Sequence, residues 1–229
     1  MAFEYIKNNL DGLREELSDI SRRVGVAVPT LVAVTKSGTD EELVALARAG
    51  ITDIGENRPG EVKRRGELLR EHGFTPRMHE IGTLQRNKIK LIIETAAMIH
   101  SVDSYKLAYD IDRLAEKCGR RIPVLIELNS ADEEAKSGVS IDGCERLLNE
   151  ILPLKNIEIS GLMTMGPALD DPEGLRPYFR KTKELFDKLA SSYGFGDTPT
   201  LSMGMSDSYA VAIEEGSTLV RVGRKLFKK

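Results

Sequence analysis

Short apolar runs alternate with amphipathic segments along nearly the whole chain. The runs are Leu31–Val34, Asp53–Gly55, Arg77–Gly82, Met98–Val102, Val124–Leu128, Ile157–Met165, Thr200–Met205 and Thr218–Val222. Near-continuous apolar runs are typical of strands that are covered on both faces, as in parallel sheets. The pattern therefore predicts eight strand–helix units of about 24 residues each, which is the spacing of a (β/α)8 barrel.

Capping and breaking residues mark the ends of the predicted helices. Thr39 precedes a helical run, and Glu42 lies three residues after Thr39, which is the pattern of a capping box. Pro59 and Pro172 stand at plausible first helical positions. The predicted helices end at glycines, where a left-handed residue is common. These glycines are Gly50, Gly73, Gly119, Gly194 and Gly216.

The predicted fold is one α/β domain over residues 1–229, a (β/α)8 TIM barrel with an extra N-terminal helix at residues 3–24. Apolar residues at helical spacing predict that helix. An open, doubly wound sheet shares the same alternation. The barrel is preferred because the units number eight and no GxGxxG motif follows the first strand.

Composition and charge narrow the classes of function. The chain carries 33 basic and 36 acidic residues, interspersed, for a net charge of −3. No basic block indicates nucleic acid or an anionic membrane as a partner. The N-terminus lacks a signal pattern, and the longest apolar stretch, Leu91–Ile99, is too short to span a bilayer. We therefore expect a cytoplasmic protein.

The cysteines and histidines predict no metal site. Cys118 and Cys144 form no CxxC motif and lie near no histidine cluster. Both fall in predicted helices, where a small hydrophobic role is the simpler interpretation.

Lys36 is the most informative residue at a strand end, where barrel active sites lie. It follows Leu-Val-Ala-Val-Thr, so the pattern places an ammonium group at the mouth of an apolar barrel. Apolar surroundings disfavour the charged form, and the neutral amine is the form that condenses with an aldehyde. The alternative is a lysine that reaches out to solvent.

The turns after the seventh and eighth strands indicate an anion site. In Leu201–Asp207, Gly204 permits close approach of the backbone and Ser206 supplies a hydroxyl near a helix predicted at about 207–215. Gly223 follows the eighth strand, and barrels often bind phosphate with these two loops. The alternative is a plain helix cap made by Ser206 or Asp207.

Arg221 lies within an otherwise apolar strand, Leu-Val-Arg-Val-Gly. A buried guanidinium is costly unless it is paired, so we expect it to meet a ligand or a protein partner. A structural ion pair with a carboxylate is an equally good interpretation.

Seven ordered sequence blocks resemble the pyridoxal phosphate homeostasis proteins, single-domain relatives of the alanine racemase barrel. The blocks are Ala33–Lys36, Gly55–Asn57, His79 with Ile81–Lys88, Lys136–Gly138, Gly161–Met165, Leu201–Asp207 and Arg221–Gly223. The resemblance covers about Leu31 to Phe227. It implies a fold like the barrel of type III pyridoxal phosphate enzymes, with pyridoxal 5′-phosphate held as an imine.

The resemblance also implies roles for individual residues. Lys36 would carry the imine, and Arg221 would face the pyridine nitrogen and keep it unprotonated. Asn57 would lie near the phenolic oxygen of the ring, while His79 and Met163 would line the cofactor pocket. The residues expected around the phosphate are Ser202, Met205, Ser206, Gly223 and Arg224.

Some residues depart from the family pattern. Met78 and Glu80 flank His79 where an aromatic and an apolar residue are usual, and Arg58-Pro59-Gly60 replaces the usual end of the second block. Arg224 stands where threonine is common, and Lys228-Lys229 ends the chain without the usual glycine. These departures bear on the detailed geometry of the pocket.

Two functions of different classes are compatible with the resemblance. One is a monomeric carrier that buffers pyridoxal phosphate or delivers it to apo-enzymes, with no catalysis. The other is an amino-acid racemase, which needs an acid/base group on each face of the substrate α-carbon. Related racemases supply the second group from an additional domain, which we do not find in this chain, and no tyrosine is an obvious substitute. We therefore favour the carrier. A sugar-phosphate barrel enzyme without this cofactor fits the blocks less well.

Overall fold

Eight parallel strands form a closed barrel in the computed structural model of the chain, which describes residues 3–131, 133 and 137–229. The strands are β1 (Thr30–Val34), β2 (Asp53–Glu56), β3 (Arg77–Glu80), β4 (Ala96–Val102), β5 (Ile122–Asn129), β7 (Ile157–Thr164), β8 (Thr200–Ser202) and β9 (Leu219–Val222). Pairing of β4 with β5 and of β1 with β9 closes the ring. The short β6 (Val139–Ser140) extends the sheet beside the end of β5. The predicted barrel is confirmed.

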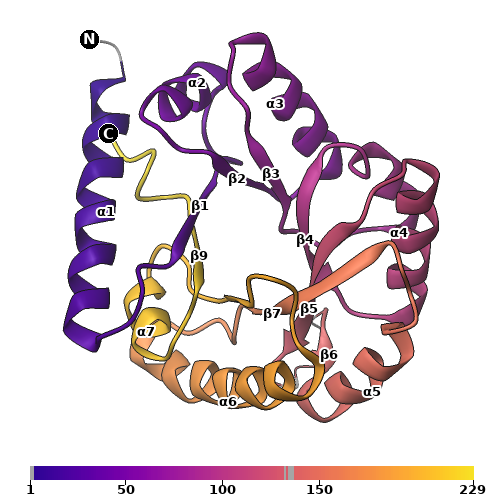
Figure 1. The fold of residues 1–229 in the computed structure, drawn as a ribbon. Coiled ribbons are helices and arrows are strands. Elements are labelled where there is room, and N and C mark those ends of the chain that lie inside the picture. Colours follow the sequence, from indigo (N-terminus) through magenta and orange to yellow (C-terminus); the bar gives the residue numbers. More distant parts are fainter. Residues whose placement is uncertain (1–2, 132, 134–136) are drawn as a thin grey trace.

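Helices cover the outside of the barrel (Figure 1). They are α2 (Asp40–Arg48), α3 (Pro59–Glu71), α4 (Tyr105–Lys117), α5 (Ile141–Ile151), α6 (Arg176–Tyr193) and α7 (Tyr209–Glu214). The third unit has only a 3-10 helix, η1 (Arg86–Leu91), where the repeat predicted a full helix.

The boundary signals hold at most positions. Thr39 and Glu42 form the predicted capping box, and Pro59 begins α3. The prediction for Pro172 is wrong in one respect, because Pro172 begins a 3-10 turn, η2 (Pro172–Leu175), and α6 starts only after it. The five predicted glycines all have positive φ, between 61° and 89°.

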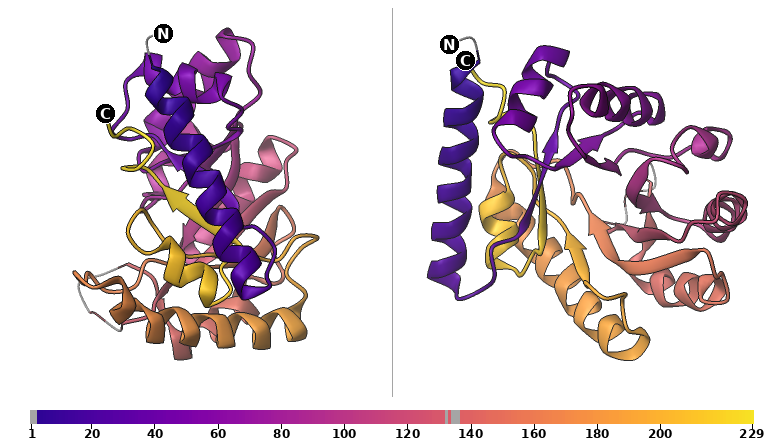
Figure 2. Two further views of the ribbon diagram at one scale, coloured as in Figure 1. Left: turned by 90° about the vertical axis from the view of Figure 1, so that its left-hand side faces the viewer. Right: turned by 45° about the horizontal axis from the view of Figure 1, so that its top comes forward.

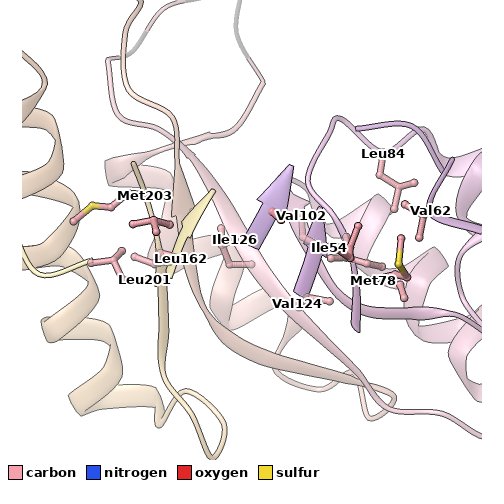
Figure 3. Close-up of a cluster of buried hydrophobic side chains, with 14 of the residues drawn as sticks. Ile54, Val62, Met78, Leu84, Val102, Val124, Ile126, Leu162, Leu201 and Met203 are labelled. Atoms are coloured by element: carbon pink, nitrogen blue, oxygen red, sulfur yellow. The ribbon is translucent and has the colours of Figure 1, made fainter. Parts of the chain in front are cut away.

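The core has two parts, because strand side chains point alternately outward and inward. The outward side chains of the strands pack against the helices in one large apolar cluster (Figure 3). Leu125 lies between two of these outward residues, so it points inward. There it meets Met98 and Met163, and the three fill part of the barrel interior.

The extra N-terminal helix, α1 (Glu4–Val24), is confirmed and packs beside α7 and α2 (Figure 2). Its residues Ile6, Leu10, Leu13 and Leu17 are buried. The two ends of the chain lie close together, since the Asn9 side-chain amide donates to the Lys228 carbonyl over 2.7 Å.

The described residues hold no helix long and apolar enough to cross a membrane. In the same part of the chain, no three histidine, cysteine or acidic side chains gather at metal-binding distance. Cys144 is buried in α5, where burial raises the pKa of its thiol to about 12, and Cys118 is exposed after α4.

Candidate functional site

A cavity of about 420 Å³ opens at the carboxyl ends of β1, β2, β7, β8 and β9. This is the end of a barrel where active sites lie, and the volume suits a small ligand, for which pockets span about 300–1,000 Å³. Seven of the ten residues predicted for the site line it. They are Lys36, Asn57, Met205, Ser206, Arg221, Gly223 and Arg224.

Lys36 reaches the cavity from the turn that follows β1. Its side chain is exposed, so the expected desolvation by an apolar surround is wrong. Among the described residues, no carboxylate lies within ion-pair distance of its amine. The amine is therefore directed to the cavity without a protein partner.

The turn that carries Lys36 is anchored from below by buried polar groups. Arg65 of α3 donates to the Thr35 carbonyl over 2.5 Å, and its guanidinium lies 3.1 Å from the Glu56 carboxylate. The Thr35 hydroxyl also bonds to Glu56. Burial raises the pKa of Glu56, and the Thr35 bond and Arg65 act against that rise. These contacts fix the backbone one residue before the amine.

The turns after β8 and β9 form an anion cradle beside Lys36. The Ser206 hydroxyl oxygen accepts from the Gly223 amide over 3.2 Å, which leaves the hydroxyl proton free to donate. In the described part of the chain, the main-chain amides of Ser206, Asp207 and Arg224 have no acceptor. Consecutive free amides in a turn are a typical site for a phosphate.

Gly223 brings the last strand close to the first. A Cβ atom at this position would lie 2.8 Å from the Val34 carbonyl oxygen, so only glycine fits. Gly204 has a different role from the one expected, because a Cβ there would meet Ala212 at 2.5 Å in α7. Its φ of 91° and its close contact serve the packing of that helix.

The interpretation of Ser206 or Asp207 as a simple helix cap is wrong. Helix α7 begins at Tyr209, two residues later than predicted, and Ser208 occupies the capping position without a capping hydrogen bond. Asp207 instead forms an ion pair with Arg224 at the exposed rim of the cavity. The Ser206 hydroxyl therefore remains available to a ligand.

Arg221 is buried and forms part of the cavity wall. Its guanidinium donates to the Ser202 hydroxyl and, over 3.1 Å, to the Thr164 carbonyl. No described carboxylate pairs with it, which argues against the structural ion pair. Burial lowers the pKa of Arg221 to about 10, and the charge of Glu127 opposes that change. The side chain is thus positively charged at neutral pH.

Three predicted site residues lie below the cavity and do not line it. His79 is buried between Asp53 and His100, 3.0 and 2.9 Å away. Met163 belongs to the apolar filling of the barrel, and Ser202 binds Arg221. Lys136, from the fourth sequence block, lies outside the described residues.

The sequence interpretation missed one wall of the cavity. The segment after β7 contributes Met165, Pro167, Ala168 and Leu169, and Pro172 and Leu175 of η2 complete the wall. Met165, Leu169 and Met205 are exposed at the mouth. The stretch 163–169, which contains a proline and is apolar except for Thr164, was a signal of such a wall.

The arrangement places the barrel in a known class. The family model described as alanine racemase, N-terminal domain, matches residues 8–229. A pyridoxal phosphate homeostasis protein of Aquifex aeolicus is 41% identical over 197 residues, which cover 86% of this chain and 85% of that protein. The chain therefore belongs to the pyridoxal phosphate homeostasis protein family.

Solved structures agree with this assignment. An unknown protein from Bifidobacterium adolescentis has 34% identity and a TM-score of 0.91, and covers 98% of this chain and 95% of that one. PipY of Synechococcus elongatus, solved with PLP bound, is 28% identical to this chain, with a TM-score of 0.84. The match covers 97% of this chain and 100% of the PipY chain.

Proposed function

We propose that this chain binds pyridoxal 5′-phosphate in the cavity and contributes to intracellular homeostasis of the cofactor by buffering or delivering it. The single observation that carries the proposal is an unpaired lysine amine in one small cavity with the Ser206–Gly223 cradle. The names of the relatives and the bound ligand of PipY support the same cofactor.

The residues present fit this ligand group by group. Lys36 would condense with the aldehyde to form an imine and release water. The free amides of Ser206, Asp207 and Arg224 would hold the phosphate, together with the Ser206 hydroxyl. Gly223 leaves the space that the phosphate needs. The apolar wall at Ile81, Leu169 and Leu175 would cover the ring.

Arg221 sets the electronic character of the site. A guanidinium donates and never accepts, so against the pyridine nitrogen it would keep that nitrogen unprotonated. When bound, the cofactor supplies an electron sink, and the sink is weaker without a proton on its ring nitrogen. The residue therefore favours holding the cofactor over using it.

A carrier also agrees with the acid/base groups at the cavity. Among the described lining residues, the ionisable side chains are Lys36, Asp207, Arg221 and Arg224. Asp207 is already paired with Arg224. Racemisation needs an acid/base group on each face of the α-carbon, and among the described lining residues only Lys36 is suited to that role.

The absorbance spectrum of three proteins tests the proposal. We expect the wild type to show an imine band in the visible or near-ultraviolet range that borohydride removes. Lys36→Ala should lose the band. Lys155→Ala is the matched control, since Lys155 is exposed at the opposite end of the barrel, before β7, and should keep the band. A reducible band that survives in Lys36→Ala would contradict the assignment.

A separate test concerns catalysis. Incubation of the loaded protein with alanine or serine in heavy water should leave the α-hydrogen in place. Exchange at a rate typical of enzymes, about 1 s⁻¹ or faster, would support the racemase instead. A monomeric state, a cytoplasmic location and transfer to apo-enzymes remain predictions from the sequence.

A further inference from the structure

A chain of buried polar side chains crosses the interior of the barrel from β2 to β9. Asp53 lies 3.0 Å from His79 Nε2, and His79 Nδ1 lies 2.9 Å from His100 Nε2. His100 Nδ1 lies 3.1 Å from the Ser202 hydroxyl, which also binds the Arg221 guanidinium. His79, His100 and Ser202 are all at most 1% exposed, so water does not compete for these bonds.

The two ends of this chain determine the direction of every hydrogen bond in it. The Arg221 guanidinium can only donate, so it gives its N–H to Ser202 and leaves the Ser202 hydroxyl proton for another acceptor. Asp53 can only accept in its ionised form. Burial opposes ionisation, but the bonds from His79 and Thr52 outweigh it and lower the pKa of the Asp53 carboxyl.

If both imidazoles are neutral, each is then protonated on Nε2. Ser202 donates to His100 Nδ1, His100 Nε2–H donates to His79 Nδ1, and His79 Nε2–H donates to Asp53. Each neutral imidazole uses its one donor and its one acceptor. No other assignment that keeps Ser202 and both neutral rings within the chain satisfies all four bonds.

The surroundings of His100 favour its neutral state. Burial lowers the pKa of His100 well below its usual range, and the positive charge of Arg221 acts in the same direction. The carboxylate of Glu127, in β5, acts on Arg221 at one end of the hydrogen-bond series. At the other end, the Arg77 guanidinium lies 3.5 Å from the Asp53 carboxylate. A proton added to His79 would make both of its nitrogens donors and so reverse the direction of the bond to His100.

We propose that His79 and His100 are positioning residues that hold the Ser202 oxygen as the acceptor for Arg221 and so fix the guanidinium at the cavity wall. The inference rests on the proposed function, because Arg221 would face the bound ring. It also gives His79 and Ser202 roles that differ from direct contact with the cofactor. Loss of these hydrogen bonds would let Arg221 adopt other orientations. The apparent affinity for pyridoxal phosphate would then fall with the fraction of molecules in which Arg221 is correctly placed.

Histidine NMR tests the hydrogen-bond chain without any cofactor. The sequence holds three histidines, and His72 is exposed at the end of α3, where it serves as the internal reference. Nitrogen-15 spectra should show His79 and His100 as neutral Nε2–H tautomers. An Nδ1–H tautomer or an imidazolium at either buried position would overturn the inference.

A pair of substitutions at His100 tests the positioning role. Glutamine keeps one donor and one acceptor, whereas leucine has a similar size and neither. Pyridoxal phosphate titrations, followed by the imine band, should give a dissociation constant on the order of tenfold higher for His100→Leu. His100→Gln and the control His72→Gln should stay within about twofold of the wild type.

The two readouts separate the possible failures. If the wild type forms no imine, the proposed function fails. The NMR tautomers then still decide whether the series of hydrogen bonds through the histidines is present. If the wild type forms the imine and His100→Leu binds as tightly with the same spectrum, the positioning role is wrong. A His100→Leu protein with a native circular dichroism spectrum ensures that weak binding does not reflect unfolding.

Discussion

Glu80 is a buried carboxyl group that the proposed function does not use. It is fully buried at the end of β3, and one oxygen accepts from the Gly82 amide over 3.1 Å. Its other oxygen, Oε2, has no hydrogen-bond partner among the described residues. Burial raises the pKa of Glu80 to about 8, the Gly82 bond opposes the rise, and the charge of Glu56 adds to it. The folded protein thus holds a proton on Glu80 at neutral pH.

The stability of the protein should therefore depend on pH through Glu80. The folded state binds this proton up to about pH 8, while the unfolded chain releases it near 4.5. The stabilisation is full below pH 4.5 and is lost as the pH rises to about 8. Glu80→Gln removes this dependence, so the variant should not lose this stability as the pH rises. The difference in unfolding free energy, variant minus wild type, should therefore become more positive by roughly 2–4 kcal/mol between pH 5 and pH 8.5.

Urea unfolding at the two pH values measures this difference. Glu150→Gln, at an exposed position of α5, is the control and should change little with pH relative to the wild type. Equal pH dependence in Glu80→Gln and the wild type would mean that Glu80 is ionised in the folded protein.

Among the elements, the turn after β3 supports the turn after β2. A Cβ atom on Gly82 would lie 2.3 Å from the Asn57 carbonyl oxygen, and main-chain atoms cannot yield as a flexible side chain can. Asn57 lines the cavity, so this close contact of two turns positions one of its residues. The contact explains why a glycine is needed at position 82.

Gly82→Ala should displace Asn57 and weaken the site. We expect a loss of about 1–3 kcal/mol in unfolding free energy, as for other overpacked positions, and weaker retention of pyridoxal phosphate. Gly60→Ala in α3 is the matched control, since nothing lies within 4 Å of a Cβ there. It should be neutral or stabilise by up to about 1 kcal/mol. Denaturant unfolding and the imine absorbance check both variants, and equal behaviour would refute the contact.

Elements with strong local signals could be predicted from the sequence. The strands, the capping box and the glycines with positive φ depend on residue type and spacing, and the structure has them at the predicted places. The helix expected in the third strand–helix unit could not be predicted well, because the segment after β3 forms only the 3-10 helix η1. There the barrel repeat was a weaker guide than local packing.

The candidate site was predictable only where it depends on strand ends. Lys36 and Arg221 follow from the barrel rule, and the family resemblance adds Asn57 and Arg224. The series of hydrogen bonds through the histidines was not foreseen, because it joins residues of five strands that only closure of the barrel brings together. His100 did carry a signal, as a polar residue inside the apolar run Met98–Val102, and buried polar residues are informative.

For the whole molecule, the site depends on the first and last strands being neighbours. β1 pairs with β9 in parallel, with Val32 opposite Arg221 and Ala33 opposite Val222. This pairing sets the turn that carries Lys36 beside the Gly223 turn. Helix α1 and the C-terminal residues cover the same side of the barrel and bind each other through Asn9. Closure of the barrel is therefore also assembly of the cofactor site.

The most direct test of the account is the location of the reduced cofactor on the chain. The protein is incubated with pyridoxal 5′-phosphate, reduced with borohydride, digested and analysed by mass spectrometry. When less than one equivalent of pyridoxal 5′-phosphate is added, the account predicts one phosphopyridoxyl group, attached to Lys36. A label attached to another lysine, or no label at all, would contradict it.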